Sequence, residues 1–256
     1  MAKRRSVEIG TIGLLHGVSH IYMAALPPLY LIIQKEFSVS FVELGLIGSV
    51  FMVTSILQGV AGYLVDKFGR KLLTMIGMLV YTVAVFAFSL SPSFLFLLVF
   101  VLVAGLGSTT FHPATYSLIT MRATKEHLGK SMAYHQFGGF LGGAFGTALV
   151  AYLASYLGWR TTLQIIPIAG LSVMLLFWLI VKEEKTANRS LRENINDKGK
   201  FRITTPLLII IFVAFIGSLG GTGAYLPAFL SKAYGESIAW AGILTGIVEA
   251  VGCVSL

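Results

Sequence analysis

Long apolar segments follow one another along almost the whole chain, separated by short polar links. They lie near residues 9–33, 42–65, 72–91, 93–119, 130–156, 161–181 and 204–230, and an eighth begins near 238 and still continues at the last residue. About 20 apolar residues are enough for a helix to cross the hydrocarbon core of a bilayer. The pattern therefore predicts an all-α polytopic membrane protein whose first six helices form one bundle.

The segment between the sixth and seventh apolar runs, residues 182–203, is polar and charged. Pro27 ends the outer part of the first run within Ala-Leu-Pro-Pro-Leu, and Pro227 does the same in the seventh within Tyr-Leu-Pro-Ala-Phe. Two parallel repeats of six helices are a known arrangement of secondary transporters. We predict a six-helix bundle over 1–181, a cytoplasmic linker over 182–203, and an incomplete second bundle over 204–256, formed by the seventh helix and part of the eighth.

That domain pattern has a consequence for the length of the protein. A second repeat as long as the first would need many more residues than 204–256, so the missing C-terminal half is expected in a full-length protein. A complete eight-helix protein is the alternative.

Composition supports a membrane location and excludes several classes of protein. Of the 256 residues, 56% are hydrophobic and 12% are charged, and the mean hydropathy is +0.84. Soluble domains carry about 25% charged residues. The single cysteine, Cys253, excludes an internal disulfide framework and any CxxC site.

The net charge of +8 reflects topology. Lys and Arg gather in alternate links, and of the 19 in the chain only Lys35, Arg160 and Lys232 fall on the opposite side. The positive-inside rule then places the N-terminus in the cytoplasm. We expect a multi-pass protein of the prokaryotic plasma membrane, with the lipid bilayer and a small-molecule substrate as partners and no nucleic acid.

The link between the second and third runs carries a compact motif, Gly62-Tyr-Leu-Val-Asp66-Lys67-Phe-Gly69-Arg70-Lys71. Gly62 permits close approach of a neighbouring helix, Asp66 can pair with Arg70 one turn later, and Gly69 permits a tight turn. Arg70 and Lys71 hold the loop on the cytoplasmic side, and Lys67 adds to the same charge.

Every specified position of this motif is similar to the loop motif of the major facilitator superfamily, Gly-x-Leu-x-Asp-Arg/Lys-x-Gly-Arg-Arg/Lys. The resemblance implies a transporter that works by alternating access. It also implies that Asp66 braces the two halves on the cytoplasmic side when the cavity opens outward.

Four histidines lie within the apolar runs, where ionisable residues are expected to be functional. His16 and His20 share a helix face, and His16, His112 and His135 each lie roughly 10 Å from the cytoplasmic end of their helix at 1.5 Å per residue. A proton site, ordinary structural hydrogen bonds and a metal site all remain open. Position 17 is Gly, so the HExxH motif of zinc proteases is absent. We predict no metal, no cofactor and no catalytic residue.

His112 stands in the most specific context, Gly105-Leu-Gly-Ser-Thr-Thr-Phe-His112-Pro113. Pro113 frees a backbone carbonyl about four residues earlier, which a membrane tolerates only where protein or a watery cavity satisfies it. This stretch, together with Leu128-Gly-Lys-Ser131, resembles the fosmidomycin-resistance branch of the superfamily. The resemblance implies export of a small solute or drug, a fosmidomycin-like compound included, in exchange for protons. A membrane-embedded His-metal enzyme and a non-transporting scaffold are the alternatives.

Further polar and small residues complete the expected site. Gln58 and Gln136 are uncharged candidates for substrate contact. Gly138, Gly142 and Gly146 line one helix face and favour close helix contact, with helix packing alone and a role in transport direction both open. Phe86, Phe88, Phe94 and Phe96 are expected to face lipid or the interface.

Overall fold

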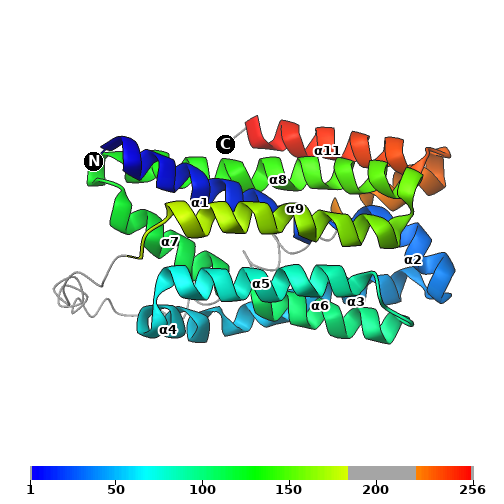
Figure 1. Cartoon of the computed structure of the whole chain (residues 1–256). Helices are drawn as coiled ribbons and strands as arrows, with labels where there is room; N and C mark the ends of the chain where they lie inside the picture. The colour runs from blue at the N-terminus through cyan, green and yellow to red at the C-terminus, as the bar shows by residue number, and fades with distance from the viewer. Residues whose placement is uncertain (1, 184–222, 255–256) are drawn as a thin grey trace, which may run out of the picture.

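The computed structural model describes residues 2–183 and 223–254 as helices joined by short turns (Figure 1). Within these residues, six helical stretches are long and apolar enough to cross a membrane: Arg4–Phe37, Phe41–Phe68, Arg70–Phe88, Phe94–Arg122, Lys125–Leu157 and Trp159–Ile180. They coincide with the first six apolar runs, so the predicted all-α membrane fold is confirmed. The eighth run contains a shorter apolar helix, and residues 204–222 of the seventh lie outside the described residues.

Several of these stretches are divided into shorter helices. The elements in chain order are α1 (Ala2–Met23), η1 (Pro27–Leu29), α2 (Tyr30–Phe37), α3 (Phe41–Val53), η2 (Thr54–Leu57), α4 (Gln58–Phe68), α5 (Arg70–Phe88), α6 (Phe94–Ser108), α7 (Phe111–Arg122), η3 (Lys125–His127), α8 (Leu128–Leu157), α9 (Trp159–Ile180) and α11 (Ile238–Val254). Residues 223–234 are also helical. The break after α1 falls just before Pro27, and the break between α6 and α7 falls a few residues before Pro113. Proline explains both breaks, because it cannot supply the helical N–H.

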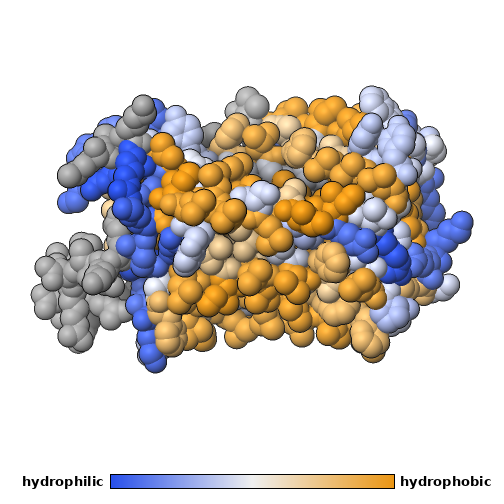
Figure 2. All heavy atoms as spheres, viewed as in Figure 1, coloured by the Kyte–Doolittle hydropathy of each residue, from blue (hydrophilic) through white to orange (hydrophobic). Residues whose placement is uncertain are grey.

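The surface has the pattern of a membrane protein. Figure 2 shows a broad hydrophobic band across the middle of the helices and hydrophilic residues at both ends. We call one end the basic end, because Arg4, Lys67, Arg70, Arg122 and Lys130 lie there, at the start of α1 and at the ends of α4, α5, α7 and α8. Exposed apolar side chains such as Ile56 (80%) and Leu179 (70%) would be unfavourable in water and suit a lipid environment.

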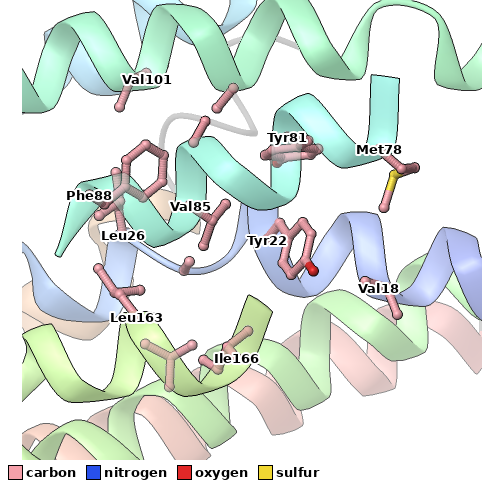
Figure 3. Close-up of a cluster of buried hydrophobic side chains, with 14 of the residues drawn as sticks. Val18, Tyr22, Leu26, Met78, Tyr81, Val85, Phe88, Val101, Leu163 and Ile166 are labelled. Atoms are coloured by element: carbon pink, nitrogen blue, oxygen red, sulfur yellow. The ribbon is translucent and has the colours of Figure 1, made fainter. Parts of the chain in front are cut away.

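The bundle core lies where α1, α5, α6 and α9 meet. Tyr22 of α1 and Tyr81 of α5 contact edge to face, with ring centroids 5.3 Å apart, among aliphatic side chains from all four helices (Figure 3). Phe88 belongs to this cluster and is only 3% exposed, so the prediction that it faces lipid is wrong. It occupies the inner face of α5 beside Tyr81 and Val85, whereas Phe86 and Phe96 are exposed.

Helix α8 is packed between α1 and α11, and small residues make both contacts possible. A Cβ added at Gly142 would lie 2.5 Å from the Cα of Gly17, and one added at Gly146 would lie 2.8 Å from the Cα of Ile21. Gly138 meets the backbone of Gly13 in the same way. The expected glycine face therefore brings the backbones of α1 and α8 together, as small residues do in membrane helix pairs.

Candidate functional site

Three of the four membrane histidines meet between α1, α7 and α8. The imidazole of His16 stacks on that of His135 with centroids 4.0 Å apart, and it meets the ring of His112 edge to face at 5.2 Å. His16 and His135 are buried, and His112 is half-buried. His16 Nδ1 lies 2.8 Å from the backbone carbonyl oxygen of His135. Phe111 closes the cluster by stacking on His16 at 5.6 Å.

A glycine makes room for this cluster. The ring of His16 lies directly over Gly139, where an added Cβ would be 2.6 Å from the ring atom Cε1 and 2.8 Å from Nδ1. Any side chain at position 139 would displace the imidazole. The glycine-rich stretch of α8 thus serves two purposes, close packing against α1 and space for His16.

His20 lies one turn further along α1, with its ring 4.6 Å from that of His16. Across α8 it approaches Glu249 of α11. The point where a Cβ of residue 143 would sit is 3.8 Å from both His20 Nδ1 and Glu249 Oε2. The Thr147 hydroxyl oxygen lies 3.3 Å from that same carboxylate oxygen. An imidazole and a carboxyl group therefore flank Gly143 within the apolar part of the bundle.

The two glutamine candidates differ in their surroundings. Gln136 lies on the exposed face of α8, and its Oε1 accepts a hydrogen bond of 3.4 Å from the Tyr116 hydroxyl of α7. The Tyr116 ring in turn stacks on His112, with centroids 5.6 Å apart. Gln136 is thereby connected to the histidine cluster, whereas Gln58 is the first residue of α4.

At the basic end, the motif between α4 and α5 forms a connected set of contacts. Arg70 Nη2 lies 3.4 Å from Asp66 Oδ1, and Arg70 Nε donates a hydrogen bond to Ser117 of α7. The carboxylate of Glu183 accepts from the backbone amides of Arg70 (3.2 Å) and Lys71 (2.8 Å). A carboxylate at this position satisfies the free amides of a helix N-terminus. The turn is therefore fixed to α7 and to the segment that follows α9.

The two motif glycines behave differently. Gly69 has φ of +106°, a backbone region that is open essentially to glycine alone. Among residues 2–183 and 223–254, the atom nearest to a Cβ added at Gly62 is the Pro113 Cβ, at 3.9 Å, so the close helix approach expected there stays a prediction.

This contrast gives a direct test. Gly69→Ala is expected to lower stability by roughly 1–3 kcal/mol, because alanine strains the turn and its Cβ would lie 3.2 Å from Glu183 Oε2. Gly62→Ala is the matched control and should leave stability unchanged or slightly raised. Heating the purified protein in detergent and measuring the folded fraction compares the two. Equal losses of stability would contradict the backbone argument.

A buried ion pair joins α1 to α7 at the basic end. Arg122 Nε lies 2.5 Å from Glu8 Oε2, and the Arg122 side chain is fully inaccessible while that of Glu8 is 6% exposed. Arg122 Nη1 donates to the carbonyl of Leu118 at 2.9 Å, and its Nη2 donates to the carbonyl of Lys182. Arg4 reaches Glu8 from the exposed side at 3.2 Å.

A cavity of about 1330 Å³ lies between α1, α8 and α9, separate from the histidine cluster. Its walls are mostly apolar, with Ile9, Phe145 and Val173 among them, and Arg5 and Lys130 lie at its basic end. None of His16, His20, His112 and His135 is among its lining residues.

The sequence prediction left out several residues of these sites. Thr115 and Tyr116 contact the cluster histidines, and Glu8 and Glu183 hold the basic end together. Glu8 pairs with Arg122, and Glu183 accepts from the amide of Lys71, each more than a hundred positions away. The one available signal was position: Glu8 directly precedes the first apolar run, and Glu183 follows the sixth.

Comparison with known proteins places this arrangement in a family. The profile of the Major Facilitator Superfamily matches residues 12–256. The uncharacterized MFS-type transporter YfnC of Bacillus subtilis is 31% identical over 170 residues, which are 66% of this chain and 41% of YfnC. The fosmidomycin resistance protein of Escherichia coli is 25% identical over 237 residues, which are 90% of this chain and 58% of that protein.

Solved structures agree on the fold. A bacterial homolog to the human lysosomal transporter Spinster, in an inward-facing and occupied conformation, superposes with a TM-score of 0.77 at 20% identity. The match covers 96% of this chain and 58% of the Spinster homolog. The chain therefore spans about half the length of the relatives it matches.

Proposed function

Because the chain belongs to the Major Facilitator Superfamily, we propose that it acts, within the full-length protein, as a secondary transporter that exports a small organic solute by alternating access. A fosmidomycin-like phosphonate is the proposed substrate class, and protons moving inward are the proposed driving ion. The observation that carries the proposal is the group of four histidines inside the membrane-spanning helices. Ionisable side chains are expensive there and mark ion or substrate pathways.

Two arguments support the substrate class: the negative charge of a phosphonate and the similarity to the fosmidomycin resistance protein. A phosphonate is anionic and needs a cationic or hydrogen-bonding partner, which protonated imidazoles provide. The half-buried ring of His112, with Tyr116 and Gln136 beside it, is the accessible side of the cluster. The likeness to the fosmidomycin resistance protein over 90% of this chain supports the same class.

Proton coupling is proposed at His20 and Glu249. Both groups approach Gly143, one from α1 and one from α11. A carboxyl and an imidazole exchange a proton when they come within hydrogen-bond distance or are bridged by one water. Because the two helices pack on opposite sides of α8, movement of α11 relative to α1 would change this separation.

The motif between α4 and α5 is the proposed cytoplasmic gate. Asp66 is half-exposed, and its carboxylate contacts Arg70, which is itself held by Ser117. This position, at the basic end between α4 and α5, is where we propose that a helix of the second half meets the bundle. This assignment places the N-terminus in the cytoplasm, in line with the positive-inside rule, in a plasma membrane. Residues 182–203 are then the cytoplasmic link between the bundle of residues 1–181 and the following helices, which start with 204–256.

A growth assay tests the proposal. The full-length gene, expressed in a bacterial strain without its own exporter, is expected to raise the fosmidomycin concentration that stops growth several-fold. His112→Gln and Asp66→Asn should abolish the gain, because one removes a site imidazole and the other the gate carboxylate. Lys125→Gln, an exposed charge change at the same end, is the control and should keep it.

Transport itself is measured in everted membrane vesicles carrying a proton gradient. Addition of fosmidomycin should dissipate the gradient with the unmodified protein and fail to do so with His20→Gln. If the protein reaches the membrane in normal amounts yet neither growth nor the gradient responds, export of this substrate class is refuted.

A further inference from the structure

The histidine cluster contains more nitrogen lone pairs than the surrounding protein satisfies. One ring nitrogen of each of His16, His112 and His135 can be chosen so that the three lie within 4.8 Å of one another. The rings come from three different helices, α1, α7 and α8. Among the described residues, His16 Nε2, His112 Nδ1 and His135 Nδ1 are buried and have no hydrogen-bond partner.

The hydrogen bond to the backbone fixes the tautomer of His16. Its Nδ1 lies 2.8 Å from the carbonyl oxygen of His135, and a carbonyl oxygen can only accept. Nδ1 therefore carries the hydrogen in the neutral ring. The buried Nε2 is left with an unshared lone pair.

A similar argument applies to His135. The Thr115 hydroxyl donates its single hydrogen to the carbonyl of Phe111 at 2.8 Å, so it can only accept from His135 Nε2, 3.5 Å away. Nε2 then carries the hydrogen of His135, and the buried Nδ1 presents a second lone pair. Two acceptors within one buried cluster need a cation or donor between them, because an unsatisfied buried polar atom costs about 1–3 kcal/mol.

We propose that His16, His112 and His135 bind one divalent transition-metal ion of the zinc class. Three neutral imidazoles suit Zn²⁺, Co²⁺, Ni²⁺ or Cu²⁺, whereas Mg²⁺ and Ca²⁺ prefer oxygen ligands. Three protein ligands with one open position are a common zinc arrangement. The carbonyl of His135 and the hydroxyl of Thr115 are the second partners that orient ligating histidines in such sites.

The three rings are already near the spacing that a bound ion requires. In a tetrahedral site with Zn–N bonds of about 2.0–2.1 Å, ligating nitrogens lie roughly 3.3 Å apart. One nitrogen of each of the three rings already lies within 4.8 Å of one nitrogen of each of the others. A bound ion would connect α1, α7 and α8 at one depth of the bundle. The proposal shares His112 with the proposed transport, but the two are tested separately, because ion binding is measured without substrate or gradient.

Calorimetric titration of the full-length protein tests the site. The protein, purified with a tag that lacks histidine and stripped with chelator, is expected to bind one Zn²⁺ per chain and to give no response to Mg²⁺. His16→Gln, His112→Gln and His135→Gln should each weaken binding at least ~10-fold. His127→Gln, at an exposed histidine outside the cluster, is the matched control and should bind as the unmodified protein does.

A second measurement needs no variant and covers the case in which a buried substitution prevents folding. The Co²⁺-loaded unmodified protein should have the visible absorption of tetrahedral cobalt with nitrogen ligands, and X-ray absorption of the Zn²⁺ form should contain imidazole scattering. Absence of stoichiometric binding would overturn the proposal. So would binding that survives all three substitutions, or a metal spectrum without imidazole.

Discussion

Replacing Gly142 with alanine is expected to lower the stability of the protein by about 1–3 kcal/mol, the usual cost of overpacking a closely packed contact. The new Cβ would lie 2.5 Å from the Cα of Gly17, and it faces backbone atoms of α1 that no rotamer change can move aside. The helices α1 and α8 would have to separate, which would also disturb the stacking of His16 on His135.

Gly129→Ala provides the matched control on the same helix. No atom of the described part of the chain lies within 4 Å of a Cβ added there, and the helical backbone gains about 0.5–1 kcal/mol when alanine replaces glycine. Thermal unfolding in detergent, followed by the amount of protein that stays monodisperse, should rank Gly129→Ala at or above the unmodified protein and Gly142→Ala below it. The same melting temperature for both variants would refute the close helix contact.

Arg122→Gln is expected to cost about 3–5 kcal/mol, because it leaves the buried Glu8 carboxylate without its main partner. It also removes the donors to the carbonyls of Leu118 and Lys182. Loss of a buried charge partner is much more costly than loss of an exposed one.

Arg4→Gln isolates the effect of burial, since Arg4 pairs with the same carboxylate but is 53% exposed. Its removal should cost about 0–1 kcal/mol. Unfolding by denaturant in mixed micelles measures both variants on one scale. Two losses of similar size would mean that the Glu8–Arg122 contact does not act as a buried pair.

The location of the spans could be predicted from the sequence because hydropathy is a local property. The six apolar runs and the six membrane-capable helices coincide within a few residues. The break at η2, between α3 and α4, had no such signal. Thr54 there fits against Gly105 of α6, where an added Cβ would lie 2.7 Å from the Thr54 hydroxyl, and this contact depends on the tertiary fold.

The candidate sites could be predicted only in part, because their contacts also depend on the tertiary fold. Equal depth of His16, His112 and His135 could be counted from helix rise, but their hydrogen-bond partners could not. Arg122 was noted only as a topological charge, although its side chain is fully inaccessible. The hydrophobic period of a helix predicts which residues share one face. Which side chains of two helices pair depends on how each helix is rotated about its axis and on the angle at which the two cross.

The chain is held at two consecutive residues as it leaves α9. The carbonyl of Lys182 accepts from Arg122, and the carboxylate of Glu183 accepts from the first amides of α5. In mechanical terms, these residues are an anchor. A force that pulls on the chain beyond Glu183 would act on α5 and α7 through these hydrogen bonds. Through Arg122 it would also act on α1, before it acted along the axis of α9. Helices α1, α5, α7 and α9 would then take up such a load together.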